Sequence, residues 1–347
     1  MSSLDDLASD PLFQLNSLLW LAQPLPSGSD VTPLLWQRGF AVYALAPLLT
    51  LPPDVRLKLQ DAGLPHQGST RPDVVLRRER DRRHAMMENK GKSFGPKSST
   101  AEQARTLLVA SGPRAAEILG LRPTDVGRSA AAYLVASASA QQMRETLRTL
   151  RKELQSAGIE SGETPVVAIE FDSQAVHLIA DSDAREFFGL DERLAFLAVE
   201  AGNDPRPLYF IPYDPDCQQD PEEEAFCKRV LFERIQATVL GAAGRALPPA
   251  TVPFEAERLL DDATWGMYGV WDNADTRKHM RKLTRFLLGK LASAVCAEVQ
   301  QAFLYIEGQG WLLNIASGDA QARICNVLAR FSCETMEVSA DQWELFD

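Results

Sequence analysis

The first third of the chain alternates between helical and strand-like spacing of its hydrophobic positions. Residues 10–23 carry apolar side chains at every third or fourth position, which predicts an amphipathic helix. Residues 32–50 are helix-like at first and become strand-like over Phe40–Leu45. Residues 71–94 place two short apolar runs on either side of a charged turn, a pattern that predicts two neighbouring strands joined as a hairpin. The apolar face of the first helix would consist of Leu12, Leu15, Leu19 and Ala22.

The next segments predict helices separated by a strand. Residues 99–102, Ser-Thr-Ala-Glu, form a capping-box pattern, so we expect a helix from Thr100 to about Ala110. A short helix over 114–119 and a small-residue strand over 129–138 follow. Residues 141–157 predict a long helix whose inner stripe would be Met143, Leu147, Leu150 and Leu154, and whose outer face would carry Arg144, Arg148, Arg151 and Lys152.

The second half predicts a mixture of short strands and long helices. Strands are expected at 166–171 and 176–180, which would form a hairpin, at 206–212, at 303–306 and 311–315, and near 336–338. Helices are expected after the acidic segment 214–224, at 275–299 and at 319–331, with 246–254 as a linker. The acidic segment is interpreted as a solvated loop and helix start, with a metal cluster as the alternative.

Length and composition indicate about two globular domains. The chain has 347 residues, of which 45% are hydrophobic and 24% charged. The polar segment Ile159–Pro165 contains Gly and Pro and is the predicted boundary. We therefore expect an α/β domain over 1–158, with a mixed sheet flanked by helices, and an acidic α+β domain over 165–347 that is partner-binding or regulatory.

Targeting and redox signals favour a cytoplasmic protein. The acidic N-terminal segment lacks the basic region of a signal peptide, and the longest apolar run, Phe40–Leu51, is too short to cross a membrane and contains Pro47. The five cysteines are scattered and never spaced as Cys-X-X-Cys, so neither a zinc site nor a disulfide framework is indicated. Reduced thiols in the cytoplasm are the simplest interpretation.

The net charge of −11 argues against a general nucleic-acid binder, but the charge is unevenly distributed. Residues 1–155 hold 20 Lys and Arg against 15 Asp and Glu, whereas the remaining residues hold 16 against 32. Within 71–97 there are nine basic and four acidic residues. A phosphate backbone would need such a basic surface. The alternative is that Arg77, Arg78, Arg80, Arg82 and Arg83 form a solvated hairpin tip.

The hairpin over 71–94 carries the candidate chemistry. Side chains alternate along a strand, so Glu88 and Lys90 point to one face and Asn89 to the other. If the strands pair, Asp73 joins Glu88 and Lys90 at one end of the sheet. Two carboxylates there could hold a hard divalent cation, Mg²⁺ or Mn²⁺, and a neighbouring lysine could position a water and stabilise negative charge.

Pro72-Asp73, followed after fourteen residues by Glu88-Asn89-Lys90, resembles the signature of the PD-(D/E)XK (restriction-endonuclease-like) nuclease superfamily. The resemblance covers roughly residues 39–120. It implies a restriction-endonuclease-like mixed sheet, catalytic roles for Asp73, Glu88 and Lys90, and a metal ion held by Asp73, Glu88 and the Asn89 carbonyl. Lys92, Lys97, Arg77 and Arg78 are the expected nucleic-acid contacts.

The chain departs from the family pattern at several positions. Many of these nucleases have an acidic residue on an early helix, but no glutamate precedes Glu79 here, and Asp30 or Gln37 would have to substitute. One exonuclease branch has a Gln-X-X-X-Tyr motif; here Gln103 is followed by Leu107, so Gln103 is expected to be an exposed helix residue. His84, near the turn, is also expected to be exposed rather than catalytic.

Two functions of different classes follow. The first is a Mg²⁺-dependent endonuclease that hydrolyses DNA phosphodiester bonds, alone or as the nuclease component of a restriction or phage-defence system. The alternative is a non-catalytic, nuclease-like adaptor that contacts a protein partner through its acidic C-terminal domain. The basic helix face at 141–157 is either solvated or a DNA contact, and the basic residues of 275–299 are either a second contact or internal partners of the acidic segment.

Overall fold

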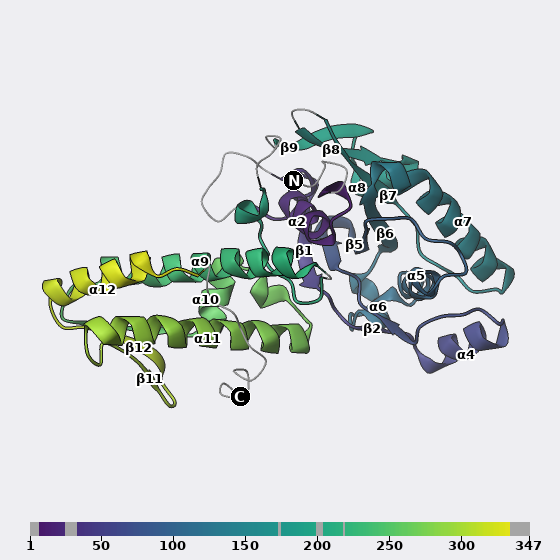
Figure 1. Ribbon diagram of the computed structural model, residues 1–347. Helices are drawn as coiled ribbons and strands as arrows, with labels where there is room; N and C mark the ends of the chain where they lie inside the picture. The colour runs from purple at the N-terminus through teal and green to yellow at the C-terminus, as the bar shows by residue number, and fades with distance from the viewer. Residues whose placement is uncertain (1–6, 25–32, 173–174, 199–203, 218, 334–347) are drawn as a thin grey trace. The chain divides into compact units, whose positions relative to one another are not determined.

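The computed structural model describes residues 7–24, 33–172, 175–198, 204–217 and 219–333 (Figure 1). The chain divides into two compact units, of which unit 1 comprises residues 1–205 and 270–273, and unit 2 comprises residues 206–269 and 274–347. Among the described residues, no helix is long and apolar enough to span a membrane. The predicted strand near 336–338 and the candidate Asp30 lie outside the described residues.

Unit 1 is built on a seven-stranded mixed sheet with the strand order β1-β4-β5-β6-β7-β8-β9 (Figure 1). β5 is parallel to β6, and β6 to β7, while the other neighbours are antiparallel. The strands are β1 (Phe40–Leu45), β4 (Val74–Arg78), β5 (Arg83–Lys90), β6 (Arg128–Ala136), β7 (Val166–Phe171), β8 (Ala175–Ala180) and β9 (Arg193–Ala198). The α/β prediction for the first half of the chain is confirmed.

The predicted hairpin over 71–94 is confirmed. β4 and β5 are antiparallel, with Val74 opposite Met87 and Arg78 opposite Arg83. The turn between them is a short 3-10 helix, Glu79–Asp81, closed by Arg82 in the left-handed conformation with φ of 55°. This register brings the residues just before β4 next to the carboxyl end of β5, which is what the candidate site requires.

Helices cover both faces of the sheet. α2 (Pro11–Ala22) packs on β1, β5 and β6, and α3 (Leu34–Gln37) lies beside it. α5 (Ser99–Ala110) and α7 (Ala140–Ser156) pack on each other and on β6 and β7. The even-numbered residues of β5 share the core of α5 and α7, so the odd-numbered ones face α2.

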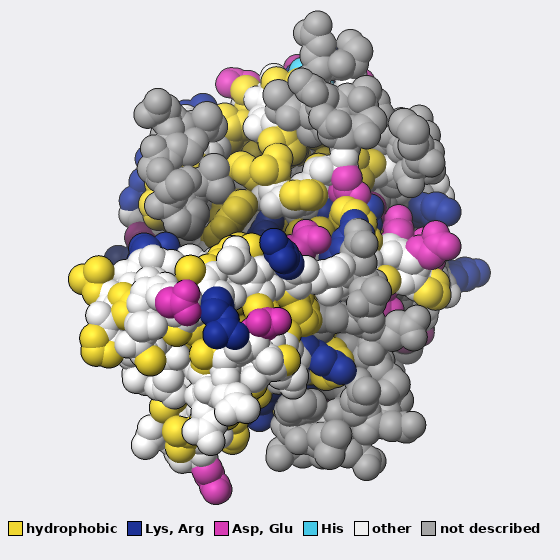
Figure 2. Space-filling model, turned by 60° about the vertical axis from the view of Figure 1, so that its left-hand side comes forward, with side chains coloured by type: hydrophobic (Ala, Val, Ile, Leu, Met, Phe, Trp, Pro, Cys, Tyr) yellow, Lys and Arg dark blue, Asp and Glu magenta, His cyan; other side chains and the backbone are white. Residues whose placement is uncertain are grey.

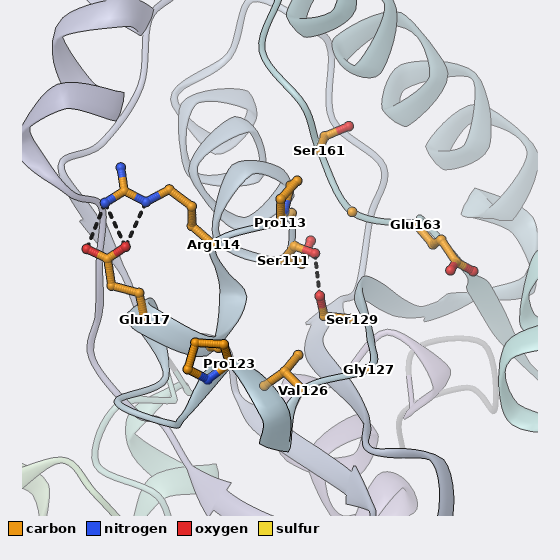
Figure 3. Close-up of a pocket in the computed structure, with 13 residues that line it drawn as sticks. Ser111, Pro113, Arg114, Glu117, Pro123, Val126, Gly127, Ser129, Ser161 and Glu163 are labelled. Atoms are coloured by element: carbon orange, nitrogen blue, oxygen red, sulfur yellow. Dashed lines mark hydrogen bonds and ion pairs between the residues drawn. The ribbon is translucent and has the colours of Figure 1, made fainter.

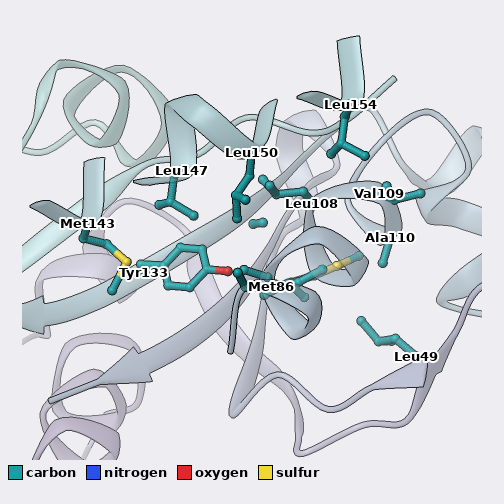
Figure 4. Close-up of a cluster of buried hydrophobic side chains, with 14 of the residues drawn as sticks. Leu49, Met86, Leu108, Val109, Ala110, Tyr133, Met143, Leu147, Leu150 and Leu154 are labelled. Carbon is teal, nitrogen blue, oxygen red and sulfur yellow. The ribbon is translucent and has the colours of Figure 1, made fainter. Parts of the chain in front are cut away.

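The predicted apolar stripe of α7 forms the centre of this core. Figure 4 shows Met143, Leu147, Leu150 and Leu154 directed toward the sheet, above Tyr133 and Met86. All four stripe residues are buried, which at about 2 kcal/mol for each large aliphatic side chain makes α7 a main source of stability for unit 1. The basic side chains of α7 stay on its outer face.

The helix predicted at 10–23 forms as α2, but it is not amphipathic. Asp10 caps it by accepting from the Leu12 and Phe13 amides at 2.7 and 3.0 Å. Its polar residues are buried together with its apolar ones, including Gln14 and Ser17. The apolar stripe lies on one face of α2, but the other faces of the helix are buried as well. Hydrophobic spacing alone does not predict this burial.

α5 begins one residue before the predicted start. Ser98, not Ser99, is its N-cap and accepts from the Ala101 amide at 3.2 Å, so the expected capping box with Glu102 does not form. α6 (Ala115–Ile118) follows as predicted. Unit 1 also contains α4 (Pro53–Asp61), α8 (Ser182–Phe188) and the short strand pair β2 (Leu49–Thr50) and β3 (Ser69–Thr70).

The division of the chain falls later than the predicted boundary at 159–165. That segment leads from α7 into β7, which is a hydrogen-bonded neighbour of β6 in the sheet of unit 1. The predicted hairpin at 166–180 forms as β7 and β8, but it extends the sheet of unit 1. A polar segment with Gly and Pro marks a loop, and its composition does not distinguish a loop within a sheet from a domain linker.

Unit 2 consists of long helices and a small antiparallel sheet. The helices α9 (Pro221–Arg245), α10 (Ala256–Ala263), α11 (Ala274–Glu298) and α12 (Gly318–Arg330) pack on one another. The three-stranded sheet has the order β10-β12-β11, with β10 at Ala250–Phe254, β11 at Phe303–Ile306 and β12 at Gly310–Ile315. On the face drawn in Figure 2, basic and acidic side chains are interspersed with hydrophobic ones and form no single-sign patch.

Two predictions in unit 2 are wrong. The expected strand at 206–212 is a 3-10 helix, Arg206–Leu208, followed by irregular backbone whose aromatic side chains are buried. The expected linker at 246–254 contains β10, because this segment pairs with β12 despite its prolines. Pro253 is tolerated because β10 is an edge strand.

Arg105 ties together four parts of unit 1. It is buried and donates from Nε and Nη2 to Glu153 Oε2 of α7, at 3.1 and 2.8 Å. It also donates to the carbonyl oxygens of Pro65 and Pro96, at 3.3 and 2.8 Å. Arg105→Ala should lower the free energy of unfolding of unit 1 by about 2–3 kcal/mol, because it leaves buried acceptors and a partly exposed carboxylate without a donor. Urea denaturation measures this.

Arg114→Ala is the matched control for Arg105→Ala. Arg114 pairs with Asp54 and Glu117, but all three side chains are exposed, so solvent screens the interaction. The control should leave the denaturation midpoint nearly unchanged. Equal losses in the two variants would show that burial of the Arg105 network is not what stabilises the unit.

A buried carboxylate makes the stability of unit 2 depend on pH. Burial raises the pKa of Asp214 to about 7, although the Asp216 amide donates to it at 2.9 Å. The folded state therefore keeps this proton while the unfolded state loses it near the usual pKa of 3.8, so stability falls as the pH rises from about 4 to about 7. From about pH 5 to pH 8, the free energy of unfolding of the wild type should fall by roughly 2 kcal/mol more than that of Asp214→Asn, which has no proton to lose. Chemical denaturation at the two pH values checks this, and parallel losses would contradict the burial of an acidic proton.

Candidate functional site

The candidate site lies at the carboxyl end of β5. In the antiparallel register of β4 and β5, the pair beyond Val74 and Met87 is Asp73 opposite Glu88. The Asp73 carboxylate reaches across and accepts a hydrogen bond at Oδ2 from the Asn89 amide at 2.6 Å. The hairpin therefore brings together two carboxylates that fourteen residues separate in the sequence.

Glu88 and Lys90 form an ion pair on the face that is covered by α5. Lys90 Nζ donates to Glu88 Oε1 at 2.7 Å. Gln103, on α5, bridges the pair: its Nε2 donates to Glu88 Oε1 at 3.0 Å, and its Oε1 accepts from Lys90 Nζ at 3.3 Å. Glu88 Oε2 is buried and meets no hydrogen-bond partner among the described residues.

Burial controls the electrostatics of this pair. Glu88 is only 4% exposed, and burial raises its pKa, although Lys90 and Gln103 partly offset the effect by favouring the carboxylate. Burial alone would lower the pKa of Lys90, but the Glu88 carboxylate and, more weakly, Asp73 outweigh it and raise that pKa. Lys90 therefore holds its proton at neutral pH and acts as a cation and hydrogen-bond donor, not as a base.

A second set of polar groups is buried on the other face of β5. The Asn89 side chain faces α2, and neither its Oδ1 nor its Nδ2 meets a partner among the described residues. Gln14 of α2 donates from Nε2 to the carbonyl oxygens of Ala8 and Lys90, at 2.8 and 3.3 Å. The Gln14 Oε1 atom is also buried without a partner among these residues. A buried Asn89 side chain is expected to have hydrogen-bond partners, and the described residues do not provide them.

Gln14 is a residue of the early helix that is hydrogen-bonded to the end of β5. Its amide holds the backbone of Lys90, and the segment before α2 lies so close that a Cβ on Gly91 would be 2.2 Å from Ser9 O. α2 carries no acidic residue. Gln37, one of the two expected substitutes, is an exposed residue of α3.

The expected nucleic-acid contacts separate into two groups. Lys92 and Lys97 are exposed and lie in the segment that leads from β5 to α5, directly after Lys90. Arg77 and Arg78 lie at the opposite end of the hairpin, about 17 Å away for five residues of strand. The two groups cannot contact the same phosphate.

Four arginines of the hairpin tip have partners within the protein. Arg78 is buried, with its guanidinium 4.6 Å from the Phe40 ring centre and its Nε 2.8 Å from Asp81 Oδ1. Arg83 Nε lies 2.8 Å from Asp81 Oδ2, and Arg77 pairs with Glu79 at 2.9 Å. Arg82 donates to the Thr124 carbonyl at 2.6 Å. Arg80 and Arg82 are exposed, as in the solvated tip given as the alternative, whereas Arg78 is buried and Arg83 half-buried, so the tip arginines do not form one open basic surface.

The prediction for His84 is wrong. His84 is completely buried on β5, where its ring lies 6.3 Å from the ring of Tyr43, and burial lowers its pKa. It lies on the same face of β5 as Met86 and Glu88 but at the tip end of the strand, so it takes no part in the carboxylate site. The prediction places His84 at the turn, whereas β5 already begins one residue before it, at Arg83.

Gln103 is the site residue that sequence reasoning missed. It was expected to be exposed, yet it is half-buried and contacts both members of the Glu88–Lys90 pair. The available signal was its spacing: Gln103 lies one turn before Leu107, which is fully buried. The missing tyrosine of the family motif concealed this signal.

A polar cavity lies at the other end of the sheet. It has a volume of about 420 Å³ and is lined by residues near the amino end of β6, including Ser111, Ser129 and Glu163. Figure 3 shows its polar groups bonded to one another: Ser129 Oγ donates to the Ser111 carbonyl at 2.7 Å, and Arg114 pairs with Glu117. Since β5 and β6 are parallel, this cavity lies at the opposite end of the sheet from Glu88 and Lys90.

The residues at the end of β5 provide some, but not many, of the oxygen ligands that a hard cation binds. Among the described residues, no group of three or more His, Cys, Asp or Glu side chains is placed to share a metal ion. Asp73 and Glu88 nevertheless supply two carboxylates, and Glu88 Oε2 is a buried acceptor that lacks a donor in the described chain. Mg²⁺ is commonly held by one or two carboxylates and several waters, so this set is sufficient for it.

Comparison with known proteins gives no relatives. No family model, no curated protein and no solved structure matches the chain.

The hydroxyl of Tyr133 tests whether water is excluded from the site. It lies opposite Glu88 on β6, is buried, and its hydroxyl meets no partner among the described residues. Burial, with the nearby Glu88 charge, raises the pKa of Tyr133 well above its usual value. Tyr133→Phe should raise the free energy of unfolding by about 1 kcal/mol, because it removes a desolvated polar group and leaves the ring in place. A loss of similar size in thermal or urea unfolding would show that the hydroxyl is bonded.

Proposed function

We propose that the chain is a metal-dependent DNA endonuclease that hydrolyses phosphodiester bonds at the carboxyl end of β5. The observation that supports this most directly is the meeting of Asp73, Glu88 and Lys90 at one point of the sheet, through the Asp73–Asn89 hydrogen bond and the Glu88–Lys90 ion pair. The resemblance to the PD-(D/E)XK nuclease superfamily rests on these same residues. The proposal does not use Arg77 and Arg78, which lie at the other end of the hairpin.

The architecture around the site agrees with the proposed family. Asp73 of the Pro-Asp pair directly precedes β4, and the Glu-X-Lys triplet ends β5. The next helix, α5, packs against the sheet and contacts the triplet through Gln103. A restriction-endonuclease-like arrangement of this mixed sheet is part of the proposal. The DNA substrate and the membership of a restriction or phage-defence system are proposals as well.

Each residue has a role that follows from its surroundings. Asp73 and Glu88 would hold Mg²⁺ or Mn²⁺, together with the Asn89 carbonyl. A bound ion of this kind acts as a Lewis acid and makes water a stronger nucleophile. Lys90, kept protonated by Glu88, would hold the attacking water by hydrogen bonding and stabilise charge that develops on the phosphate. Gln103 positions Lys90, and the exposed Lys92 and Lys97 would bind flanking phosphates.

A non-catalytic adaptor is the second candidate, and one observation favours it. Glu88 Oε1 is already occupied by Lys90 and Gln103, and the early helix contributes the neutral Gln14 instead of a carboxylate. A site with only two carboxylates could have kept its structure without its chemistry. In that case the acidic C-terminal half of the sequence would carry the function by contacting a protein partner.

The experiment that tests the proposal is cleavage of plasmid and single-stranded DNA by the purified chain, with Mg²⁺, with Mn²⁺ or with EDTA. Wild type should cut only with a divalent ion. Asp73→Asn and Glu88→Gln should each reduce the rate at least about a hundredfold, because each removes a proposed ligand charge. Lys90→Met should reduce the rate by a similar factor, through lost stabilisation of the phosphate charge.

Glu79→Gln is the matched control, since Glu79 is an exposed carboxylate at the far end of the same hairpin. It should cut like the wild type. Full activity of Asp73→Asn would contradict the assignment of the site. Absence of cutting by folded wild type under every ion condition would favour the adaptor.

A further inference from the structure

The outer face of α7 is a basic ridge without apolar positions. Its cations lie at 144, 148, 151 and 152, which is helical spacing along one side. We call Arg144, Arg148, Arg151 and Lys152 the basic stripe. None of the large exposed hydrophobic side chains in the described chain lies on α7. A protein-binding surface normally has apolar anchors at its centre, so this ridge is suited to a different kind of partner.

Most of the basic stripe is not neutralised from within. Among the described residues, Arg148, Arg151 and Lys152 have no ion-pair partner. The nearest carboxylates on the helix are engaged elsewhere: Glu153 binds Arg105, and Glu145 accepts from Gln141. The stripe therefore leaves its charge for an external anion.

A groove runs along the carboxyl end of the stripe. Arg148, Arg151 and Lys152 line a hollow of about 600 Å³, together with residues that include Pro113, Ile159 and Glu160. Three cations face one carboxylate there. The hollow gives the stripe a concave surface in which an anionic chain can lie against the helix.

The first turns of α7 contact the segment that follows the carboxylate site in the chain. The first turns of α7 are bonded to the segment that carries Lys92 and Lys97: Ser93 Oγ donates to Gln142 Oε1 at 2.8 Å, and Thr146 Oγ1 donates to the Phe94 carbonyl at 2.9 Å. From Arg144 to Lys152 the helix rises by about 12 Å. One strand of a duplex carries a phosphate about every 3.4 Å, so the stripe matches roughly three phosphates.

We propose that the basic stripe of α7 binds the sugar-phosphate backbone of the nucleic-acid substrate without sequence preference and leads it to the carboxylate site. This inference rests on the proposed function for the identity of the substrate, but the binding step can be measured separately. The stripe itself presents only cationic side chains, which bind phosphate, so it positions the backbone and does not select bases.

The test is binding of a fluorescently labelled duplex of about 20 base pairs to the full chain in EDTA, over a series of salt concentrations. The triple variant R148Q/R151Q/K152Q should bind at least about thirtyfold more weakly near 0.1 M salt. Its slope of log affinity against log salt should be shallower by about two to three, or about 0.9 for each lost phosphate contact. The single variant Arg148→Gln should change the slope by about one third of that amount.

The control removes the same charge elsewhere in unit 1. K58Q/R122Q/R185Q replaces three exposed cations on other elements and should leave the slope within error of the wild type. An unchanged slope in the α7 triple variant, or an equal change in the control, would overturn the proposal. Displacement of the duplex by poly-glutamate as effectively as by unlabelled DNA would also overturn it, in favour of an acidic protein partner.

Binding and cleavage separate the two proposals. If Asp73→Asn binds the duplex like the wild type and the α7 triple variant does not, the stripe is supported whether or not the chain cuts DNA. If the wild type cuts DNA and the α7 triple variant binds and cuts equally well, the proposed function stands and the stripe proposal fails.

Discussion

The buried Glu88 carboxylate is the constraint around which unit 1 is arranged. A carboxylate withdrawn from water is costly unless charged and polar groups surround it, and here they come from two different levels of structure. Lys90 is supplied locally, because the strand pleat returns to the same face after two residues. Gln103 reaches Glu88 only if α5 packs on β5 in the right position. That position depends on Arg105, which bonds α5 to α7 and to two loops. The site is therefore a consequence of core packing as much as of its own residues.

The two faces of β5 are treated differently. On the α5 side, Glu88 and Lys90 satisfy one another, and only one carboxylate oxygen remains without a partner among the described residues. On the α2 side, Asn89 and Gln14 place three polar atoms in a buried environment without partners in the described chain. Unsatisfied polar groups on both sides of one strand end reduce stability, and proteins tolerate such losses mainly where function requires them. Buried polar groups on both faces of the carboxyl end of β5, and not only its carboxylates, therefore indicate a functional site there.

Short-range patterns predicted much of this structure, and long-range packing accounts for the rest. The hairpin, the helices at 99–110 and 140–156 and the meeting of Asp73 with Glu88 follow from alternation, spacing and register. Gln103 could not be placed, because the direction in which a helix residue faces the site depends on how the helix lies on the sheet. The division of the chain was set too early for a related reason: β7 joins β6 through hydrogen bonds between distant residues, and a polar loop gives no sign of this.

Charge illustrates the same limit in a different way. Counting residues pointed to the hairpin tip as the basic surface, yet Arg78 and Arg83 share Asp81, and Arg82 binds a backbone carbonyl. Those cations hold the tip together and are not available to a ligand. On α7 the density of arginine is no higher, but the helix directs its cations outward and its nearby carboxylates toward other partners. A cation contributes to recognition only when the fold leaves it without an internal partner. The surface that could receive a phosphate chain is therefore the one that adjoins the carboxylates, from the segment after Lys90 along α7, and not the richest basic run in the sequence.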